Sequence, residues 1–315
     1  MKSVEIAGRP VGPGHPCFTV AEAGINHNGD VAIAQKLISA ALLAGADAVK
    51  FQKRTVDAVF SSERLAAPVE SPFGNTYGDL KRGLELGEAE YRTIEEYCRM
   101  SSIVWYASCW DEASVDFIEQ FEPPCYKIAS PSLTDDALLR HHRSCGRPII
   151  LSTGMSSIEQ IDHAVEVLGT DDLIILHSTS TYPASLEELN LQVIPVLAER
   201  YGVPIGYSGH EVGLAGSVAA RVLGACMVER HLTLDRAMWG SDQAASVEPG
   251  GWARLVRDIH AVEVAMGDGV KRVYQSELAK QHLRRVPGQV PGHAPPTTSP
   301  PATGSPTLGG EPAGP

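Results

Sequence analysis

The sequence predicts a (β/α)8 TIM barrel, an α/β fold in which eight parallel strands alternate with helices. The first observation is a series of eight short runs rich in apolar and β-branched residues, at positions 18–21, 48–51, 103–107, 126–129, 149–152, 173–177, 204–207 and 227–232. The second is that a segment with helical periodicity follows each run, an alternation typical of a parallel sheet. The third is that no Gly-x-Gly-x-x-Gly follows the first run, which disfavours the rival doubly wound open sheet.

The segments that flank the barrel differ from it in composition. Residues 1–16 alternate briefly and then break into Gly and Pro, which predicts an N-terminal β-hairpin that plugs one end of the barrel. Residues 17–277 form the predicted barrel itself. Residues 287–315 consist largely of Pro, Gly, Thr and Ser, which bury too little apolar surface to order a chain, so we expect a disordered tail there.

Helical periodicity and helix-end signals support the barrel. The apolar stripes comprise Ala34, Leu37, Ala41 and Ala44 in the first helix, Ile158, Ile161, Val165 and Leu168 in a middle helix, and Leu255, Ile259, Val262 and Met266 in the last. Ser156 and Glu159 have the spacing of a capping box, which predicts a helix start. Gly146 followed by Pro148 predicts a helix stop and the entry of the next strand.

Two connections are longer than a minimal barrel needs. Residues 54–88 follow the second strand and are rich in Ser, Pro, Gly and Asn, and residues 235–251 follow the eighth strand. Loops of this length are usually functional. We therefore expect the first connection to act as a lid or to contact the substrate.

Composition limits the possible partners. A chain of 315 residues with 43% hydrophobic residues can bury a large core. The net charge of −12 and the lack of a basic cluster argue against nucleic acid and anionic membranes as partners. No apolar run reaches the length of about 18 residues that a membrane span requires. The six cysteines lack C-x-x-C spacing and no signal-peptide pattern is present, which predicts reduced thiols and a cytoplasmic protein.

Polar residues gather at the carboxyl ends of the predicted strands, where TIM barrels carry their active sites. These candidates are Glu22, Lys50, Gln52, Ser108, Lys127, Ser130, Ser152, Thr153, His177, Ser178, Ser208, His210 and His231. His210 and His231 end the last two strands, and two neutral imidazoles from neighbouring strands suit one divalent metal ion. A lysine is rarely buried without a partner, so Lys50 and Lys127 predict a phosphate or carboxylate site. Beside such a site, Glu22 is a candidate for acid/base work.

Several longer motifs fall on these same positions. They are Ala21-Glu-Ala-Gly-Ile-Asn-His-Asn-Gly-Asp30, Gly45-Ala-Asp-Ala-Val-Lys-Phe-Gln52, Lys127-Ile-Ala-Ser130, Ile150-Leu-Ser-Thr-Gly-Met155, His177-Ser-Thr-Ser-Thr-Tyr-Pro183, Gly206-Tyr-Ser-Gly-His210 and Glu229-Arg-His-Leu-Thr-Leu-Asp235. With these motifs in register, the chain resembles the N-acetylneuraminate (sialic acid) synthase family from about residue 4 to residue 277. No single motif would be specific enough alone.

The resemblance implies an activity and roles for the candidate residues. The family condenses phosphoenolpyruvate with an open-chain N-acetylated aminosugar, by default N-acetylmannosamine, to give a nine-carbon 2-keto-3-deoxy acid and phosphate. By the matched motifs, His210 and His231 correspond to ligands of a divalent Mn²⁺ or Mg²⁺ ion, and Glu22 to the acid beside the reacting centre. Around phosphoenolpyruvate the matches are Lys50, Ser108, Lys127, Ser130 and Ser208, and on the sugar side they are Tyr182 and Asp242. A homodimer is expected by the same analogy.

Where the chain departs from the family, the changes fall on the acceptor side. Family members usually carry a C-terminal antifreeze-like domain that lends an arginine to the partner's sugar pocket, and we expect none here. Pro131 and Ser132 stand where a small residue and an acid are usual, and Cys109 and Trp110 replace Pro-Phe. Three alternatives therefore stay open: condensation with a different sugar aldehyde in a specialised pathway, a catalytically weak barrel that needs a partner chain, and a metal-dependent aldolase or lyase that uses pyruvate itself.

Overall fold

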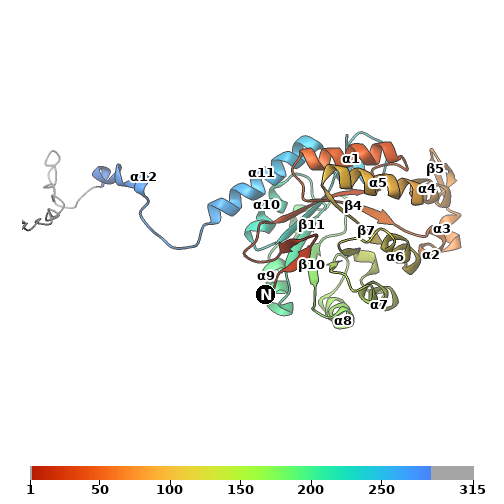
Figure 1. The fold of residues 1–315 in the computed structure, drawn as a ribbon, viewed down its shortest axis with the longest axis horizontal. Coiled ribbons are helices and arrows are strands. Elements are labelled where there is room, and N and C mark those ends of the chain that lie inside the picture. The colour runs from red at the N-terminus through yellow and green to blue at the C-terminus, as the bar shows by residue number, and fades with distance from the viewer. Residues whose placement is uncertain (1, 285–315) are drawn as a thin grey trace, which may run out of the picture. The chain divides into compact units, whose positions relative to one another are not determined.

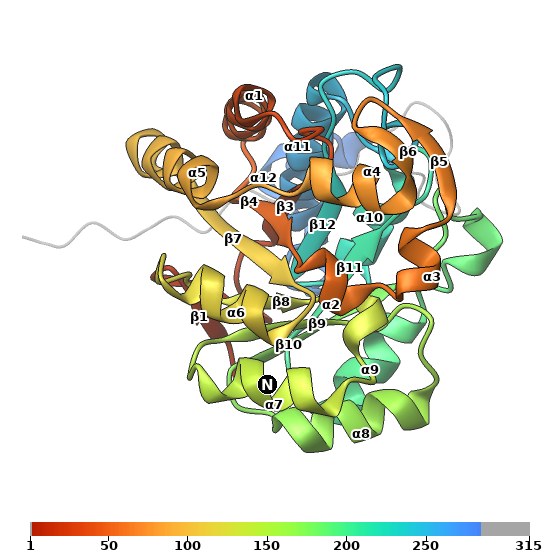
Figure 2. The same ribbon diagram turned by 90° about the vertical axis from the view of Figure 1, so that its right-hand side faces the viewer.

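Eight parallel strands close into a barrel in the computed structural model, which describes residues 2–284 (Figures 1 and 2). The strands are β3 (Phe18–Gly24), β4 (Ala48–Lys53), β7 (Val104–Cys109), β8 (Tyr126–Ile128), β9 (Ile149–Ser152), β10 (Leu173–Ser178), β11 (Ile205–Gly209) and β12 (Met227–His231). Each pairs with its sequence neighbour, and β12 pairs with β3 to complete the ring. The predicted (β/α)8 barrel is confirmed, with each predicted strand within a few residues of its place.

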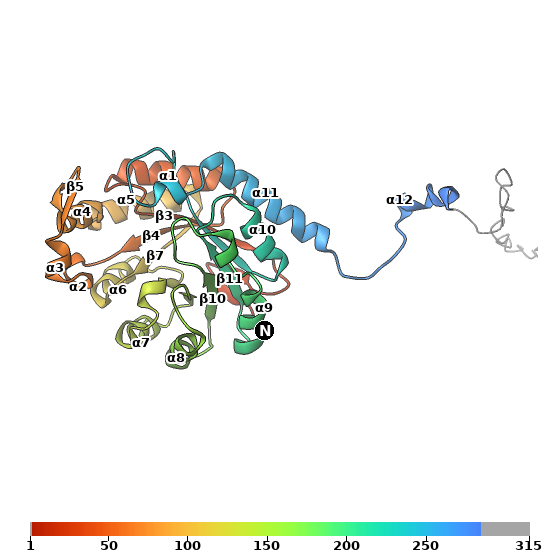
Figure 3. The same ribbon diagram turned by 180° about the vertical axis from the view of Figure 1, so that it is seen from behind.

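Helices cover the outside of the barrel, as Figure 3 shows from behind. They are α1 (Val31–Leu43), α5 (Glu88–Ser101), α6 (Glu112–Glu119), α7 (Asp136–Ser144), α8 (Ile158–Leu168), α9 (Val193–Tyr201), α10 (Ala215–Val222) and α11 (Pro249–Met266), with short 3-10 turns η1 (Ser130–Ser132) and η2 (Leu186–Glu188). The predicted stripe of α1 is wholly buried. In α11 the stripe is only partly correct, because Leu255 and Ile259 are buried whereas Met266 is exposed.

The observed helix ends agree with those predicted from the sequence, with one correction at the start of α8. α7 ends at Ser144 and Gly146 adopts a left-handed conformation before β9, as the Gly-Pro signal predicted. The capping box of α8 is formed by Ser157 and Gln160, one residue later than the predicted pair. Two overlapping matches to the same short pattern were present, and only the geometry of the first turn selects between them.

The N-terminal hairpin closes the end of the barrel where the strands begin. It consists of β1 (Val4–Ile6) and β2 (Arg9–Val11), which pair antiparallel. Val4, Ile6 and Val11 are buried against residues near the starts of the barrel strands, including Phe18 and Met227. The predicted plug is confirmed, and it leaves the opposite end of the barrel as the open one.

The long connection after β4 is a small structured insertion and not the loop that the sequence suggested. It contains α2 (Val56–Val59), α3 (Ser62–Leu65), the antiparallel pair β5 (Pro68–Ser71) and β6 (Gly74–Thr76), and α4 (Tyr77–Leu84), which lie together in Figure 2. Elements this short do not show a clear period in the sequence. Glu85 at its far end forms a 2.8 Å ion pair with Arg54 at its start, so both ends of the insertion are held at one point.

The second long connection, residues 235–251, also contains less irregular structure than predicted. Residues 243–245 form the 3-10 turn η3 (Gln243–Ala245), and α11 already begins at Pro249. Proline suits the first turn of a helix because its missing N–H would have no partner there. The predicted loop of residues 235–251 therefore ends in the first turn of α11.

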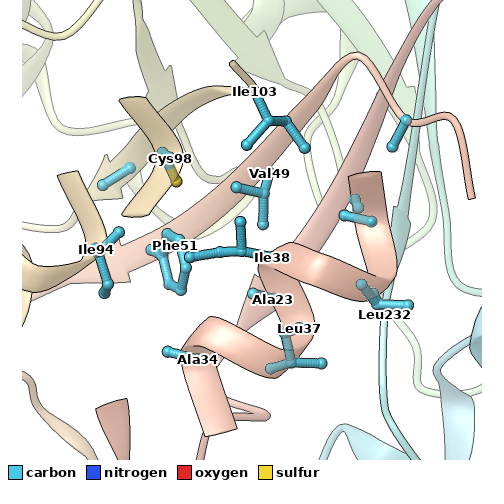
Figure 4. Packing of buried hydrophobic residues seen from close by; sticks show 14 of the residues in the cluster. Ala23, Ala34, Leu37, Ile38, Val49, Phe51, Ile94, Cys98, Ile103 and Leu232 are labelled. Carbon is cyan, nitrogen blue, oxygen red and sulfur yellow. The ribbon is translucent and has the colours of Figure 1, made fainter. Parts of the chain in front are cut away.

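The main hydrophobic core lies between the barrel wall and the helices on its outside. Figure 4 shows one region of it, where Leu37 and Ile38 of α1 pack with Val49 and Phe51 of β4 and with Ile94 of α5. None of the six cysteines forms a disulfide, and five of them are buried. Within residues 2–284, no helix is long and apolar enough to span a bilayer.

The chain divides into two compact units, and the one with the barrel ends at Asp268. The boundary at residue 277 stays a prediction. In the second unit, the described residues contain the helix α12 (Gln275–Leu278) and the 3-10 turn η4 (Gln281–Leu283). The predicted disordered tail, residues 287–315, lies outside the described residues.

Candidate active site

A cavity of about 280 Å³ opens at the carboxyl ends of the barrel strands. It is lined by all ten predicted site residues: Glu22, Lys50, Ser108, Lys127, Ser130, Tyr182, Ser208, His210, His231 and Asp242. Thr153 and His177, which the strand-end rule also selected, turn away, because their side chains bond to the backbone oxygens of Leu176 and Leu189. The structure brings the predicted residues together, and their individual roles remain predictions.

Buried polar atoms without a protein partner concentrate in this cavity. Among the described residues, they include Glu22 Oε2, Trp110 Nε1, Ser178 Oγ, Glu229 Oε2 and His231 Nδ1, all on residues that line it. Buried polar groups in native proteins are nearly always hydrogen-bonded. Such a concentration indicates that the cavity is completed by a polar ligand.

The base of the cavity is a buried ionic network centred on Glu229. Its Oε1 accepts hydrogen bonds from Lys50 Nζ at 2.8 Å and Ser208 Oγ at 3.1 Å, and it lies 4.0 Å from Lys127 Nζ. Burial alone would raise the pKa of Glu229, but Lys50 and Lys127 outweigh it and lower the pKa to about 2. Glu229 is therefore a fixed negative charge that holds both lysines in place.

Sequence reasoning missed the role of Glu229 because only the strand ends were considered. It lies two residues before His231 on β12, and alternate residues of a strand face the same side. The sequence therefore contained a signal for Glu229, because this acid lies inside a barrel strand and on the same strand face as the candidate metal ligand His231. The residue between them, Arg230, faces the other way and forms a buried ion pair with Glu211 at 2.8 Å.

Glu22 lies beside this network, and each of its two oxygens has a neighbour in the protein. Gln52 Nε2 donates to its Oε1 at 2.8 Å, and Lys50 Nζ lies 3.3 Å from its Oε2. Burial raises the pKa of Glu22, although Lys50 and His231 oppose the shift. A carboxyl group that lines a cavity and has a raised pKa is suited to take up and return a proton.

Lys127 and several serine hydroxyl groups form another side of the cavity. Lys127 Nζ donates to Ser152 Oγ at 2.7 Å, and burial together with Lys50 lowers the pKa of this lysine to about 8. Ser130 Oγ accepts a hydrogen bond from the backbone N–H of Gly154 at 3.0 Å. A side chain at Gly154 would collide with Ser180 Oγ at 2.1 Å, so glycine is needed for the close approach of the two walls.

His210 and His231 lie together at the mouth of the last two strands, with ring centroids 5.7 Å apart. His210 Nδ1 lies 2.8 Å from the Thr179 carbonyl oxygen, which fixes that nitrogen as the donor and leaves Nε2 with a free lone pair. Burial, reinforced by His231, lowers the pKa of His210 to about 3, so the ring is neutral near pH 7. No group of three or more His, Cys, Asp or Glu with metal-site spacing occurs in residues 2–284. A metal held here would have two protein ligands and several open positions.

The cavity also contains residues that the sequence did not single out. Arg54 and Trp110 come from the ends of β4 and β7, and Lys81 comes from α4 of the insertion. Arg54 and Lys81 both belong to the connection of residues 54–88, which we expected to act as a lid or to contact the substrate, but the sequence does not show which part of it reaches the cavity. Trp110 had been noted only as a departure from the family pattern.

Comparison with known proteins identifies the chain's relatives. The NeuB family model matches residues 37–271. Human N-acetylneuraminate-9-phosphate synthase is 40% identical over 86% of this chain and 77% of that protein. The N,N'-diacetyllegionaminic acid synthase of Legionella pneumophila is 34% identical over 88% of this chain and 81% of that protein. A crystal structure of N-acetylneuraminic acid synthetase from Leptospira borgpetersenii, in complex with citrate, matches with a TM-score of 0.80 and 29% identity over 89% of this chain and 95% of that one.

The family model covers seven of the eight barrel strands, from β4 to β12. The chain therefore belongs to the NeuB family and is an enzyme of the phosphoenolpyruvate-dependent transferase class.

Proposed function

We propose that this enzyme condenses phosphoenolpyruvate with an open-chain N-acetylated aminosugar, N-acetylmannosamine by default, and releases a sialic-acid-type 2-keto-3-deoxy acid and phosphate. The observation that carries the proposal is the buried Lys50–Glu229–Lys127 network beside Glu22 and the histidine pair in one cavity. A site for a small, highly charged anion thus adjoins groups suited to proton transfer and carbonyl binding.

The lysines and serines are proposed to hold phosphoenolpyruvate. Lys50 and Lys127 supply positive charge in a buried setting, where a charge-assisted hydrogen bond is stronger than in water. Hydroxyl groups of Ser108, Ser130 and Ser208 complete the contacts. Glu229 keeps both ammonium groups in position, and its single negative charge is shared between their two positive charges.

In the proposed reaction, C3 of phosphoenolpyruvate attacks the aldehyde carbon of the sugar, and the aldehyde oxygen becomes a hydroxyl by taking a proton from Glu22. Water adds to the resulting cationic C2 and gives up a proton to Glu22. The tetrahedral intermediate then breaks the bond between C2 and the phosphate oxygen. The C2 hydroxyl becomes the keto group as its proton passes to the departing phosphate. Lys50 and Lys127 stabilise the charge of the departing phosphate.

His210 and His231 are proposed to hold a divalent cation, Mn²⁺ or Mg²⁺. The residues fit this assignment because the free lone pair of His210 and the unpaired buried Nδ1 of His231 show two ring nitrogens without a full set of protein partners. A cation bound there would act as a Lewis acid toward the acceptor aldehyde. Asp242 Oδ2 lies 3.9 Å from His231 Nδ1, which is too far for a hydrogen bond.

The identity of the sugar acceptor is less well defined than that of phosphoenolpyruvate. The two curated relatives compared above are named for different products, a 9-phosphorylated sialic acid and a legionaminic acid. A different sugar aldehyde therefore remains the alternative acceptor. We further propose a cytoplasmic location, supported by six unpaired cysteines, and a homodimer by analogy with the family.

The test is phosphate release from phosphoenolpyruvate in the presence of Mn²⁺ and a panel of sugar aldehydes that includes N-acetylmannosamine, with product masses recorded. Acceptor-dependent phosphate is expected, with loss of activity in Lys127→Ala and His210→Ala and full activity in Lys36→Ala, a matched change on the exposed face of α1. In ¹⁸O-labelled water the label should enter the keto acid. Label in the phosphate would contradict the proposed bond cleavage.

Tight binding of phosphoenolpyruvate would exclude the pyruvate-dependent aldolase. Binding without turnover across the whole panel would favour the weak barrel that needs a partner chain.

A further inference from the structure

Arg230 and Glu211 form a buried ion pair next to the two histidines of the cavity. Arg230 is 1% exposed and Glu211 is 0% exposed, and Nη1 of the arginine lies 2.8 Å from Oε1 of the glutamate. Arg230 directly precedes His231 on β12, and Glu211 directly follows His210 just after β11. Each member of the pair, which we name the outer clamp, is thus the chain neighbour of a proposed metal ligand.

The outer clamp ties the segment after β11 to β12 through several bonds. Arg230 Nη1 also donates to the Gly213 carbonyl at 2.9 Å, and Nη2 donates to the backbone carbonyl of Glu211. The Glu211 carboxylate in turn accepts hydrogen bonds from Tyr207 Oη at 2.8 Å and Ser217 Oγ at 3.0 Å. One arginine and one glutamate therefore join β11, β12 and the start of α10.

The backbone pairing of the two strands stops short of the first histidine. The parallel register of β11 and β12 runs to Gly209 opposite Arg230, so His210 lies beyond the last registered pair. On its other side, the carbonyl of His210 accepts a hydrogen bond from the Ala184 N–H at 3.0 Å, while His231 is in register with β3. Each histidine is held by backbone from its far side, and the outer clamp continues the link between them.

The outer clamp lies outside the candidate active site. Both of its residues line a second cavity of about 170 Å³, and neither lines the cavity that contains the histidines. The two side chains have opposite charges and are paired, so their net charge is zero. Any effect of the clamp on a bound cation would therefore act through the positions of the histidines.

We propose that the outer clamp sets the separation of the His210 and His231 rings, so that both can bind one divalent cation. Arg230 and Glu211 are then positioning residues, and the inference rests on the metal site of the proposed function and deepens it. A bond between a metal and a histidine nitrogen is short, about 2.0–2.1 Å for zinc, so a small shift of one ring removes that ligand. Residues 2–284 contain no group of three or more His, Cys, Asp or Glu that could compensate.

Mn²⁺ binding without substrates tests the inference independently of turnover. Electron paramagnetic resonance of free Mn²⁺ gives the Kd of wild type, of His210→Ala, which should lose the binding, and of the double variant Arg230→Met, Glu211→Leu. The double variant keeps the net charge and leaves no buried charge unpaired, so its urea midpoint should lie near that of wild type. Its Kd for Mn²⁺ should nevertheless rise about 10- to 100-fold, the usual effect of losing groups that orient metal ligands.

The double variant Arg221→Met, Glu263→Leu is the matched control. This 2.9 Å pair is also largely shielded from solvent, but it lies at the hairpin end of the barrel, where Arg221 donates to the His15 carbonyl. It should leave the Kd for Mn²⁺ unchanged. Arg230→Lys is the conservative change: an ammonium lacks the planar fork that holds Glu211 and two backbone carbonyls, so the Kd should rise by about three- to tenfold.

Several outcomes would overturn the inference. They are a Kd in the folded clamp variant within about threefold of wild type, an equal rise in the matched control, and Mn²⁺ binding that survives His210→Ala. If the clamp variant does not fold, an unchanged Kd in Arg230→Lys decides against the inference.

Turnover separates this inference from the proposed condensation. If the clamp variant loses Mn²⁺ affinity but wild type releases no phosphate from phosphoenolpyruvate with any acceptor, the condensation is wrong and the clamp stands. If wild type and clamp variant bind Mn²⁺ equally and both release phosphate when an acceptor is present, the condensation stands and the clamp is wrong. A wild type that binds no Mn²⁺ would refute the metal site and the clamp together.

Discussion

Replacing Glu229 by glutamine should cost about 3 kcal/mol of the free energy of unfolding at pH 7. Glu229 is 4% exposed, and its pKa falls from an ordinary 4.5 to about 2, a difference that corresponds to about 3 kcal/mol favouring the folded state. An independent argument gives a similar figure, because removing one partner of a buried ion pair typically costs about 3–5 kcal/mol. Glutamine keeps the shape but leaves Lys50 without its 2.8 Å partner.

The pH dependence of the difference in unfolding free energy between wild type and Glu229→Gln tests the cause more sharply than its size at pH 7. Because the folded-state pKa of Glu229 is depressed, its stabilisation is complete above the unfolded pKa of about 4.3 and is lost as the pH falls toward 2. Urea unfolding of wild type and Glu229→Gln should therefore show a constant difference from pH 6 to 8 that shrinks below about pH 4.5. A difference that is equally large at pH 3 and pH 7 would refute an ionised Glu229 as the cause.

Three further predictions concern the same barrel. Phosphoenolpyruvate binding should weaken as the pH rises above about 8, since Lys127 then loses its charge; KM measured against pH should show this, and Lys127→Arg should move the change to higher pH. Gly154→Ala should raise KM for phosphoenolpyruvate at least about tenfold, because the new Cβ would displace Ser180. Arg230→Met should lower the free energy of unfolding by about 3–5 kcal/mol by leaving Glu211 buried and unpaired.

Each of these has a contrary outcome. A KM profile that is flat to pH 10 in wild type would mean that Lys127 does not contact the anion or remains charged. An unchanged KM for phosphoenolpyruvate in Gly154→Ala would show that Ser180 can move aside without affecting phosphoenolpyruvate binding. Restored stability in the double variant Arg230→Met, Glu211→Leu would confirm the charge explanation, and its failure would point to lost packing instead.

The barrel was predictable because its signals are local and repeated. Each strand is a short apolar run between turn signals, and its end defines where Glu22, Lys50 or His210 must lie. Topology then brings those ends together without any knowledge of side-chain contacts. That is why residues as distant in sequence as Glu22 and His231 could be assigned to one site.

The site residues that the sequence did not reveal, Glu229 and Lys81, were missed for a different physical reason. Glu229 acts from inside a strand, where its effect depends on which charges surround it in the folded state. The insertion is built from elements of three to eight residues, which are too short to display a period, so the expected contact of residues 54–88 with the substrate could not be narrowed to Lys81. Propensity and periodicity describe a residue's own segment, whereas these two functions depend on contacts between segments.

The ion pair between Arg54 and Glu85 has a consequence for how new substrate preferences arise. It joins the two ends of the insertion at a single point, so we expect the barrel to tolerate changes in the stretch between them. A lineage, or an engineer, could replace that stretch with one of another length while the barrel, its plug and the lysine network stay as they are. In the proposed condensation, changes in the sugar acceptor would then leave the site for phosphoenolpyruvate unaltered.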